Sequence, residues 1–435
     1  MRRVLQSTAV EAALLAALSV FVLSGIERVP FHPDEASLLY QSRDLEQLLS
    51  DPFDMAWEPS AAPSPEMTYR LLNAPLPKYV LGLGRRAAGF GPQAVAVDWD
   101  WSKTWIENAM LGALPGPRVL EAARTASATA LLIGVAALYL ATRRLAGRGA
   151  AIAAAVLLGI NALALLHGRR AMAEGTLMMS VGLAMLGILS ADRRPFLAGL
   201  AVAVAVASKT STLPLLPIGW LAALWLPGVR KLHITAAARV TLLYAAGFVV
   251  LTLALHPVLW RHPILAAQRM VEERSELLAR QVADIQMLAP DHVLSSVPQR
   301  SVVLVANLYL APLQYAEVGN YLEELGPSIQ QYQAAFGRDL LRSSAGGGFL
   351  LGLTLLGLAW GWRRARRTDG DRGRAFVLLL LATVAQASAL VIAIPLPVQR
   401  YMLPLLPFLC LWQGVGVAGG IAGPTTRRRP EVRAA

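Results

Sequence analysis

His32-Pro33-Asp34-Glu35 follows the first long apolar run of the chain, residues 8–26. Two adjacent carboxylates at the mouth of an apolar helix are costly to place there, because ionisable groups next to lipid are usually functional. We therefore predict that Asp34 and Glu35 form the acid/base end of a membrane-embedded active site. The alternative is a plain helix start, since proline suits a first turn and the helix dipole favours carboxylates there.

The composition of the chain is that of a polytopic membrane protein. Of its 435 residues, 55% are hydrophobic and only 16% are charged, which excludes a soluble globular protein. The net charge is +12, but the arginines cluster in short connections between apolar runs, as the positive-inside rule expects. The basicity therefore reflects topology and not nucleic-acid binding. The single cysteine, Cys410, cannot form an internal disulfide, so cysteine indicates nothing about the redox compartment or a thiolate metal site.

Ten apolar runs predict ten membrane spans with both termini cytoplasmic. The first run lacks a convincing small-x-small cleavage site, so we interpret it as an uncleaved span. The fifth and sixth runs are short and are expected to meet near Lys209 or to lie at a thinned, polar-lined edge. The runs cover approximately residues 8–26, 119–141, 149–166, 175–189, 196–207, 213–226, 240–259, 348–362, 375–394 and 402–421.

Two long connections lie on the outer side in this topology. Residues 27–117 form a large first outer loop with amphipathic stretches that lie partly on the membrane surface. The apolar piece 302–313 is interpreted as a surface or re-entrant segment, because a crossing there would place the following arginine cluster outside. The chain then divides into a catalytic transmembrane module over 1–265, a second outer region with surface helices over 266–345, and C-terminal spans with a basic tail over 346–435.

A set of cations at the outer ends of the spans is not explained by topology. For each residue alone, snorkelling to the interface is an equally good explanation. Six cations on one side are harder to dismiss, and together they predict a pocket for an anionic head group, because arginine binds phosphate oxygens bidentately and lysine acts as a point charge. Glu174, which follows Arg169 by five residues, is expected to neutralise an arginine or to cap its helix. The six are Lys78, Arg124, Arg169, Arg170, Lys209 and Arg400.

Carboxylates that face a cationic pocket predict a reaction type. A group that accepts a proton, opposite cations that stabilise a departing phosphate, is what transfer from a lipid phosphate requires. The sequence has no glycine-rich phosphate loop after a strand, no histidine pair at metal-binding spacing and no Gly-x-Ser-x-Gly elbow. His32 is interpreted as a hydrogen-bonding neighbour of the acids. No metal site is predicted, and a requirement for a divalent metal is left open.

In these motifs the chain resembles the GT-C superfamily of polyprenyl-phosphate-sugar-dependent glycosyltransferases. The nearest branch holds the protein O-mannosyltransferases and the bacterial aminoarabinose transferase that modifies lipid A. The resemblance covers about residues 5–265 and the region of Arg400, with a Glu at position 174 where the family commonly has Asp. The matching segments are Asp34-Glu35, Ala74-Pro75-Leu76-Pro77-Lys78, Arg124, Arg169 with Glu174, Ser208-Lys209-Thr210-Ser211, the run 256–263, and Arg400-Tyr401 before Pro404.

The resemblance implies an all-α polytopic membrane protein, a GT-C-like bundle of about ten helices with amphipathic juxtamembrane helices in the first outer loop. It implies transfer of a hexosyl or pentosyl group, with inversion, from a polyprenyl-phosphate sugar to an acceptor glycan, lipid or protein. The reaction would take place on the extracytoplasmic side of a bacterial inner membrane. Asp34 is then the general base, Glu35 orients the acceptor or pairs with a cation, and the six cations bind the donor phosphate. His32, Glu174 and Tyr401 complete the pocket.

Two other functions remain open at this point. A ten-span transporter or flippase of an anionic lipid would use the same cations without catalysis. The absence of a repeated half and of paired broken helices at the midplane disfavours it. A surface-polysaccharide ligase or polymerase is the nearer alternative, and in the sequence only the motifs distinguish it from the glycosyltransferase.

Overall fold

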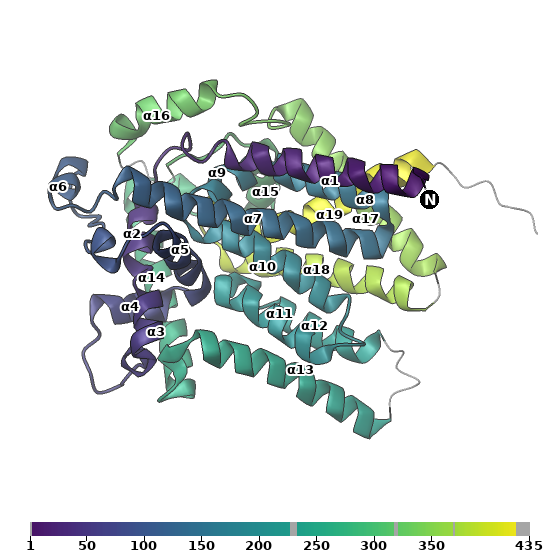
Figure 1. Ribbon diagram of the computed structural model, residues 1–435, viewed down its shortest axis with the longest axis horizontal. Helices are drawn as coiled ribbons and strands as arrows, with labels where there is room; N and C mark the ends of the chain where they lie inside the picture. The colour runs from purple at the N-terminus through teal and green to yellow at the C-terminus, as the bar shows by residue number, and fades with distance from the viewer. Residues whose placement is uncertain (1, 227–232, 317–320, 369, 423–435) are drawn as a thin grey trace, which may run out of the picture.

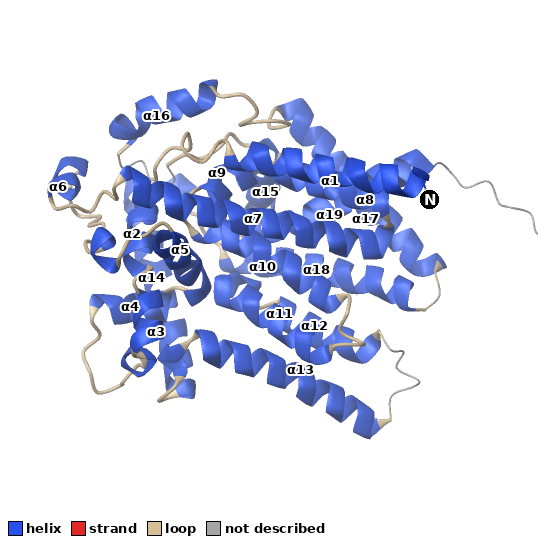
Figure 2. Cartoon of the chain, viewed as in Figure 1, coloured by secondary structure: helices blue, strands red, loops and turns tan. Residues whose placement is uncertain are grey.

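The computed structural model describes residues 2–226, 233–316, 321–368 and 370–422. Within these ranges the chain is helical and contains no strand (Figure 2). This is the all-α architecture that the apolar runs predict, because a chain that crosses lipid must satisfy its backbone hydrogen bonds within each helix.

Ten apolar helical segments coincide with the ten predicted spans, and they make the chain an integral membrane protein. Five are long enough to cross a bilayer, a bent pair forms a sixth, and four are shorter. The long segments are α7 (Pro117–Ala146), α13 (Ile234–Leu255), α17 (Ser344–Arg367), α18 (Asp371–Ala393) and Gln399–Gly420, which joins η8 (Gln399–Leu405) to α19 (Leu406–Ala422). The bent pair is α8 (Arg148–Gly159) with α9 (Ala162–Arg169), and the shorter helices lie in α1 (Arg2–Leu23), α10 (Ala173–Ile188), α11 (Pro195–Ser208) and η3 (Thr210–Thr212) with α12 (Leu215–Trp225).

Two local breaks shape this bundle. The third span bends by 57° between α8 and α9, where the Asn161 side chain caps α9 by accepting from the N–H groups of Leu163 and Ala164 at 3.0 and 3.3 Å. The short helices α11 and α12 meet at Lys209, as predicted. Small residues allow close packing elsewhere: a Cβ at Gly134 of α7 would lie only 2.7 Å from the Met178 backbone of α10.

The first outer loop is a layer of short helices at one end of the bundle (Figure 1). Its amphipathic character confirms the predicted juxtamembrane helices. The C-terminal end of α7, whose last turn carries Arg143 and Arg144, lies at the opposite end of the bundle. The elements of the loop are α2 (Pro33–Gln41), α3 (Asp44–Ser50), η1 (Pro52–Met55), α4 (Pro65–Leu72), α5 (Pro75–Ala87), η2 (Pro92–Val95) and α6 (Trp105–Met110).

The second outer region packs on the same end of the bundle. Its apolar piece does not cross: the Leu294 N–H donates to Pro395 O at 2.7 Å, and the Gln314 N–H donates to Gln399 Oε1 at 2.9 Å. The residues on both sides of the piece therefore lie beside the same short stretch of chain, which runs from the end of α18 to the start of η8. The Tyr321 hydroxyl also donates to Lys103 O of the first loop at 2.8 Å. The elements are η5 (Pro257–Leu259), α14 (Pro263–Leu288), η6 (Pro290–His292), α15 (Val297–Val305), the π-helix η7 (Ala306–Leu310) and α16 (Leu322–Ala334). The three-part division of the chain stays a prediction.

Candidate active site

The stretch around Asp34 begins α2 with a capping box. His32 Nδ1 accepts from the Asp34 N–H at 3.1 Å, and the His32 N–H donates to Glu35 Oε2 at 3.0 Å. Pro33 occupies the first turn. Burial, with some opposition from the charge on Asp34, lowers the pKa of His32 to about 3. His32 is thus a neutral hydrogen-bonding neighbour that fixes where the acids stand.

Glu35 is completely buried and is used to hold the fold. Arg124 of α7 donates to both of its carboxylate oxygens at 2.8 Å, and the Ala171 N–H donates to Oε1 at 2.7 Å. Arg124 also donates to the carbonyl oxygens of Ile26 and Val29, at 3.1 and 2.9 Å. This network ties the link between α1 and α2 to α7 and α10. Glu35 was predicted either to orient the acceptor or to pair with a cation, and these contacts match pairing with a cation.

Asp34 is the acid that remains accessible. Its side chain is 24% exposed and forms an ion pair with Arg400, which lies in the first turn of η8. Burial alone would raise the pKa of Asp34, but the charge of Arg400 and its hydrogen bond outweigh burial and hold the pKa below its usual value. Asp34 is therefore ionised at neutral pH. The fold has brought together two residues that are 366 positions apart.

Lys209 and Glu174 form a second ion pair, at 3.0 Å, in which Glu174 is buried. Glu174 thus forms an ion pair, as expected, but its partner is Lys209 and not the predicted arginine, because Arg169 and Arg170 donate to backbone carbonyls. The Tyr401 ring lies between the two pairs, because its centroid is 5.6 Å from Lys209 Nζ and 5.6 Å from Arg400 Cζ. Asp34, Arg400, Tyr401, Lys209 and Glu174 are therefore one continuous cluster, which we call the Asp34 cluster.

Arg169 and Arg170 point to backbone carbonyls. Arg169 donates to the oxygens of Val22 and Phe21 at 2.8 and 2.6 Å and so closes the C-terminal end of α1. A Cβ added at Gly25 would overlap the Arg169 guanidinium, which explains why glycine is needed there. Arg170 is buried; it donates to Pro30 O at 3.1 Å and to Tyr315 O at 2.7 Å.

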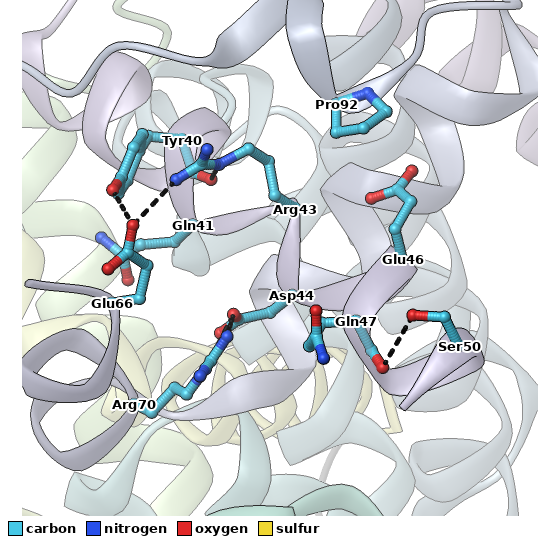
Figure 3. A pocket seen from close by; sticks show the side chains of 10 residues that line it. All are labelled: Tyr40, Gln41, Arg43, Asp44, Glu46, Gln47, Ser50, Glu66, Arg70 and Pro92. Atoms are coloured by element: carbon cyan, nitrogen blue, oxygen red, sulfur yellow. Dashed lines mark hydrogen bonds and ion pairs between the residues drawn. The ribbon is translucent and has the colours of Figure 1, made fainter. Parts of the chain in front are cut away.

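Lys78 is not joined to the Asp34 cluster by any contact in the described residues. It is buried in α5, donates to Tyr69 O at 2.9 Å and lies 3.5 Å from Asp44, which Arg70 also binds. Burial, partly opposed by Asp44, lowers the pKa of Lys78 to about 8. Asp44 lines a separate polar pocket of about 310 Å³, in which Arg70 points to Asp44 while Tyr40 and Arg43 converge on Glu66 (Figure 3).

The phosphate-binding role of the six cations stays a prediction, but their placement can be summarised by charge. Three of these cations pair with a carboxylate each, and two donate to backbone carbonyls, so the five cations outnumber the three carboxylates by two. The cations are Arg124, Arg169, Arg170, Lys209 and Arg400, and the carboxylates are Asp34, Glu35 and Glu174. In the parts of the chain that the structure describes, no group of three or more His, Cys, Asp or Glu residues is arranged to hold a metal ion.

His167 is a buried residue near the Asp34 cluster that the sequence analysis did not single out. It lies in the last turn of α9, is completely buried, and has Arg170, Arg400, Lys209 and His32 as its charged and titratable neighbours. Its only sequence signal is a polar side chain near the end of an apolar run, just before Gly168 and the two arginines.

No protein-family model and no curated protein matches the chain. Among solved structures, the chain is similar to the oligosaccharyltransferase of Archaeoglobus fulgidus tethered to an acceptor peptide, with 11% identity, a TM-score of 0.50, and coverage of 94% of this chain and 49% of that one. It is also similar to ArnT from Cupriavidus metallidurans bound to undecaprenyl phosphate, with 15% identity, a TM-score of 0.47, and coverage of 93% and 60%. The chain thus spans about half to three fifths of the length of these proteins.

Proposed function

We propose that the chain, whose fold is that of the GT-C superfamily, is a membrane glycosyltransferase that uses a polyprenyl-phosphate sugar as donor. The observation that carries the proposal is the accessible Asp34–Arg400 pair, which lies beside a second cation, Lys209, in the Asp34 cluster. The Archaeoglobus protein of similar fold is an oligosaccharyltransferase, which supports sugar transfer by analogy. The donor sugar is left open between a hexose and a pentose, and the acceptor is left open between a glycan, a lipid and a protein.

Asp34 is the general base in this mechanism. The acceptor oxygen attacks the anomeric carbon while its proton passes to a carboxylate oxygen of Asp34. The bond between the anomeric carbon and the phosphate oxygen breaks, its electron pair leaves with the polyprenyl phosphate, and the configuration inverts in this single displacement. Asp34 suits the task because it is ionised and accessible, whereas both oxygens of Glu35 are engaged.

Arg400 and Lys209 are the groups that bind the departing phosphate. The phosphate gains one negative charge as the bond breaks, and preorganised cations stabilise that charge most strongly where water is excluded. Both cations start with a carboxylate partner, so the phosphate competes with Asp34 for Arg400. Donor binding therefore releases Asp34 from its ion pair at the moment when a base is needed. Arg124 and Arg169 stabilise the structure around this site. Arg124 pairs with Glu35 and donates to Ile26 O, and Arg169 donates to Val22 O.

The active site faces the extracytoplasmic side of a bacterial inner membrane in this proposal. The support is charge asymmetry: the last turns of α7 and α17 carry arginines, Arg143 with Arg144 and Arg364 with Arg366 and Arg367. Arginine-rich ends of this kind stay in the cytoplasm. The Asp34 cluster lies at the end of the bundle where α7 begins.

The test is transfer by the purified chain in nanodiscs. The protein is incubated with undecaprenyl-phosphate-linked mannose, glucose or aminoarabinose and a bacterial envelope extract as acceptor source, and release of undecaprenyl phosphate is followed by mass spectrometry. We expect release with at least one donor in wild type and none in Asp34→Asn. Movement of lipid phosphate across vesicles without cleavage would support the flippase instead. Turnover only of diphosphate-linked donors would support the polysaccharide ligase or polymerase.

A further inference from the structure

His167 has hydrogen-bonding capacity that the rest of the protein does not use. Its imidazole is completely buried, and neither ring nitrogen has a hydrogen-bond partner in the described residues. Buried polar groups without partners are uncommon and costly in folded proteins. His256 shows the usual arrangement, since it is also buried but its Nδ1 lies 2.9 Å from Thr252 O.

The position of His167 places this unused capacity against the Asp34 cluster. Its charged and titratable neighbours are Arg170, Arg400, Lys209 and His32, which come from four separate segments of the chain. The helix that carries it, α9, packs directly on η8, the element of Arg400.

The helix end that carries His167 is also held firmly. Ser127 Oγ of α7 donates to Gly168 O at 3.0 Å, and the next residue, Arg169, is anchored to α1. A Cβ at Gly168 would lie 2.8 Å from Leu131 Cδ2, so α9 is closely packed on α7 at this point. The end of α9 that carries the buried imidazole is therefore fixed in place.

We propose that His167 binds the phosphate of the lipid donor through a ring N–H and forms the floor of the anion site. This inference rests on the proposed function and adds to it a neutral, specific contact. Arg400 and Lys209 each give up part of a carboxylate interaction when phosphate binds, whereas the hydrogen bond from His167 replaces none. A buried donor that is satisfied only by the ligand contributes strongly to the choice between a phosphate and a neutral head group.

The test compares two lipids that share a tail. Affinities for undecaprenyl phosphate and for neutral undecaprenol are measured for wild type and for His167→Phe, which keeps a ring but removes both nitrogens. We expect His167→Phe to weaken phosphate-lipid binding about ten- to a hundredfold and to leave undecaprenol binding unchanged. His167→Gln or His167→Asn, which restore an N–H near one ring nitrogen, should recover part of the loss. His256→Phe is the matched control and should retain the wild-type preference.

A role only in packing predicts other results. Equal loss of both lipids in His167→Phe, or unchanged phosphate affinity, would overturn the inference. If His167→Phe does not fold, wild type with ¹⁵N-labelled histidine gives the answer: the His167 ring signals should shift on addition of undecaprenyl phosphate and not of undecaprenol, and signals that ignore the phosphate would refute the contact. If wild type shows no preference for the phosphate lipid at all, the proposed function fails first, and the two failures are thereby told apart.

Discussion

The substitution Asp34→Asn separates the two roles that we propose for this carboxylate, general base and ion-pair partner of Arg400. Asparagine keeps the size of the side chain and removes its negative charge. Loss of a general base costs about a hundred- to ten-thousandfold in turnover. At the same time Arg400 loses the carboxylate that competes with the phosphate, and a hydrogen bond to a charged group contributes roughly 1.5–3 kcal/mol. We therefore expect the variant to bind undecaprenyl phosphate about ten- to a hundredfold more tightly while transfer is lost.

The assay measures both quantities on one preparation in nanodiscs. Turnover is followed as release of undecaprenyl phosphate from the lipid-linked sugar, and affinity is followed by titration with undecaprenyl phosphate. The control is Asp54→Asn on the remote element η1, which makes the same change of side chain elsewhere in the protein. Glu46→Gln would not serve, because it breaks an ion pair with buried Arg85. Near-normal turnover of Asp34→Asn would return Asp34 to a helix-capping role. Weaker phosphate binding by the variant would refute the competition for Arg400.

Three further results are expected. Glu35→Gln should destabilise the fold by about 3–5 kcal/mol in a denaturation assay, because it leaves Arg124 buried without its charge partner, and a stable variant would contradict this. The pKa of Asp34 is lowered in the free protein and should rise when the phosphate binds Arg400 in its place. The fall of kcat toward acid pH should therefore lie at higher pH than the fall of kcat/KM, and equal pH values for the two would exclude this exchange of partners. A cysteine at Ser328 should react with an impermeant thiol reagent from the Asp34 side while one at Thr368 should not, and the reverse pattern would invert the topology.

The apolar runs predict the bundle well because lipid contact leaves a chain little choice of composition or backbone structure. Asp34 and the late Arg400 could also be selected as candidate site residues from their positions, and the structure brings them together. Their direct pairing could not be predicted, since a charge in a sequence carries no record of its partner. For the same reason the sequence does not indicate that Arg169 donates to the carbonyls of α1 or that Lys78 pairs with Asp44. Gly25 is a local trace of the Arg169 contact, because its missing side chain leaves room for the Arg169 guanidinium.

The 366 residues between Asp34 and Arg400 also determine when the site exists during biosynthesis. Ribosomes add roughly 5–20 residues per second, so about 20–70 s pass between synthesis of the base and synthesis of its arginine. Throughout that interval the first span and Asp34 are already in place, but the second half of the site is not yet made. A chain that stalls or is cleaved before its last span therefore inserts into the membrane with an incomplete Asp34 cluster, and under the proposed function such a chain is inactive toward lipid-linked sugar.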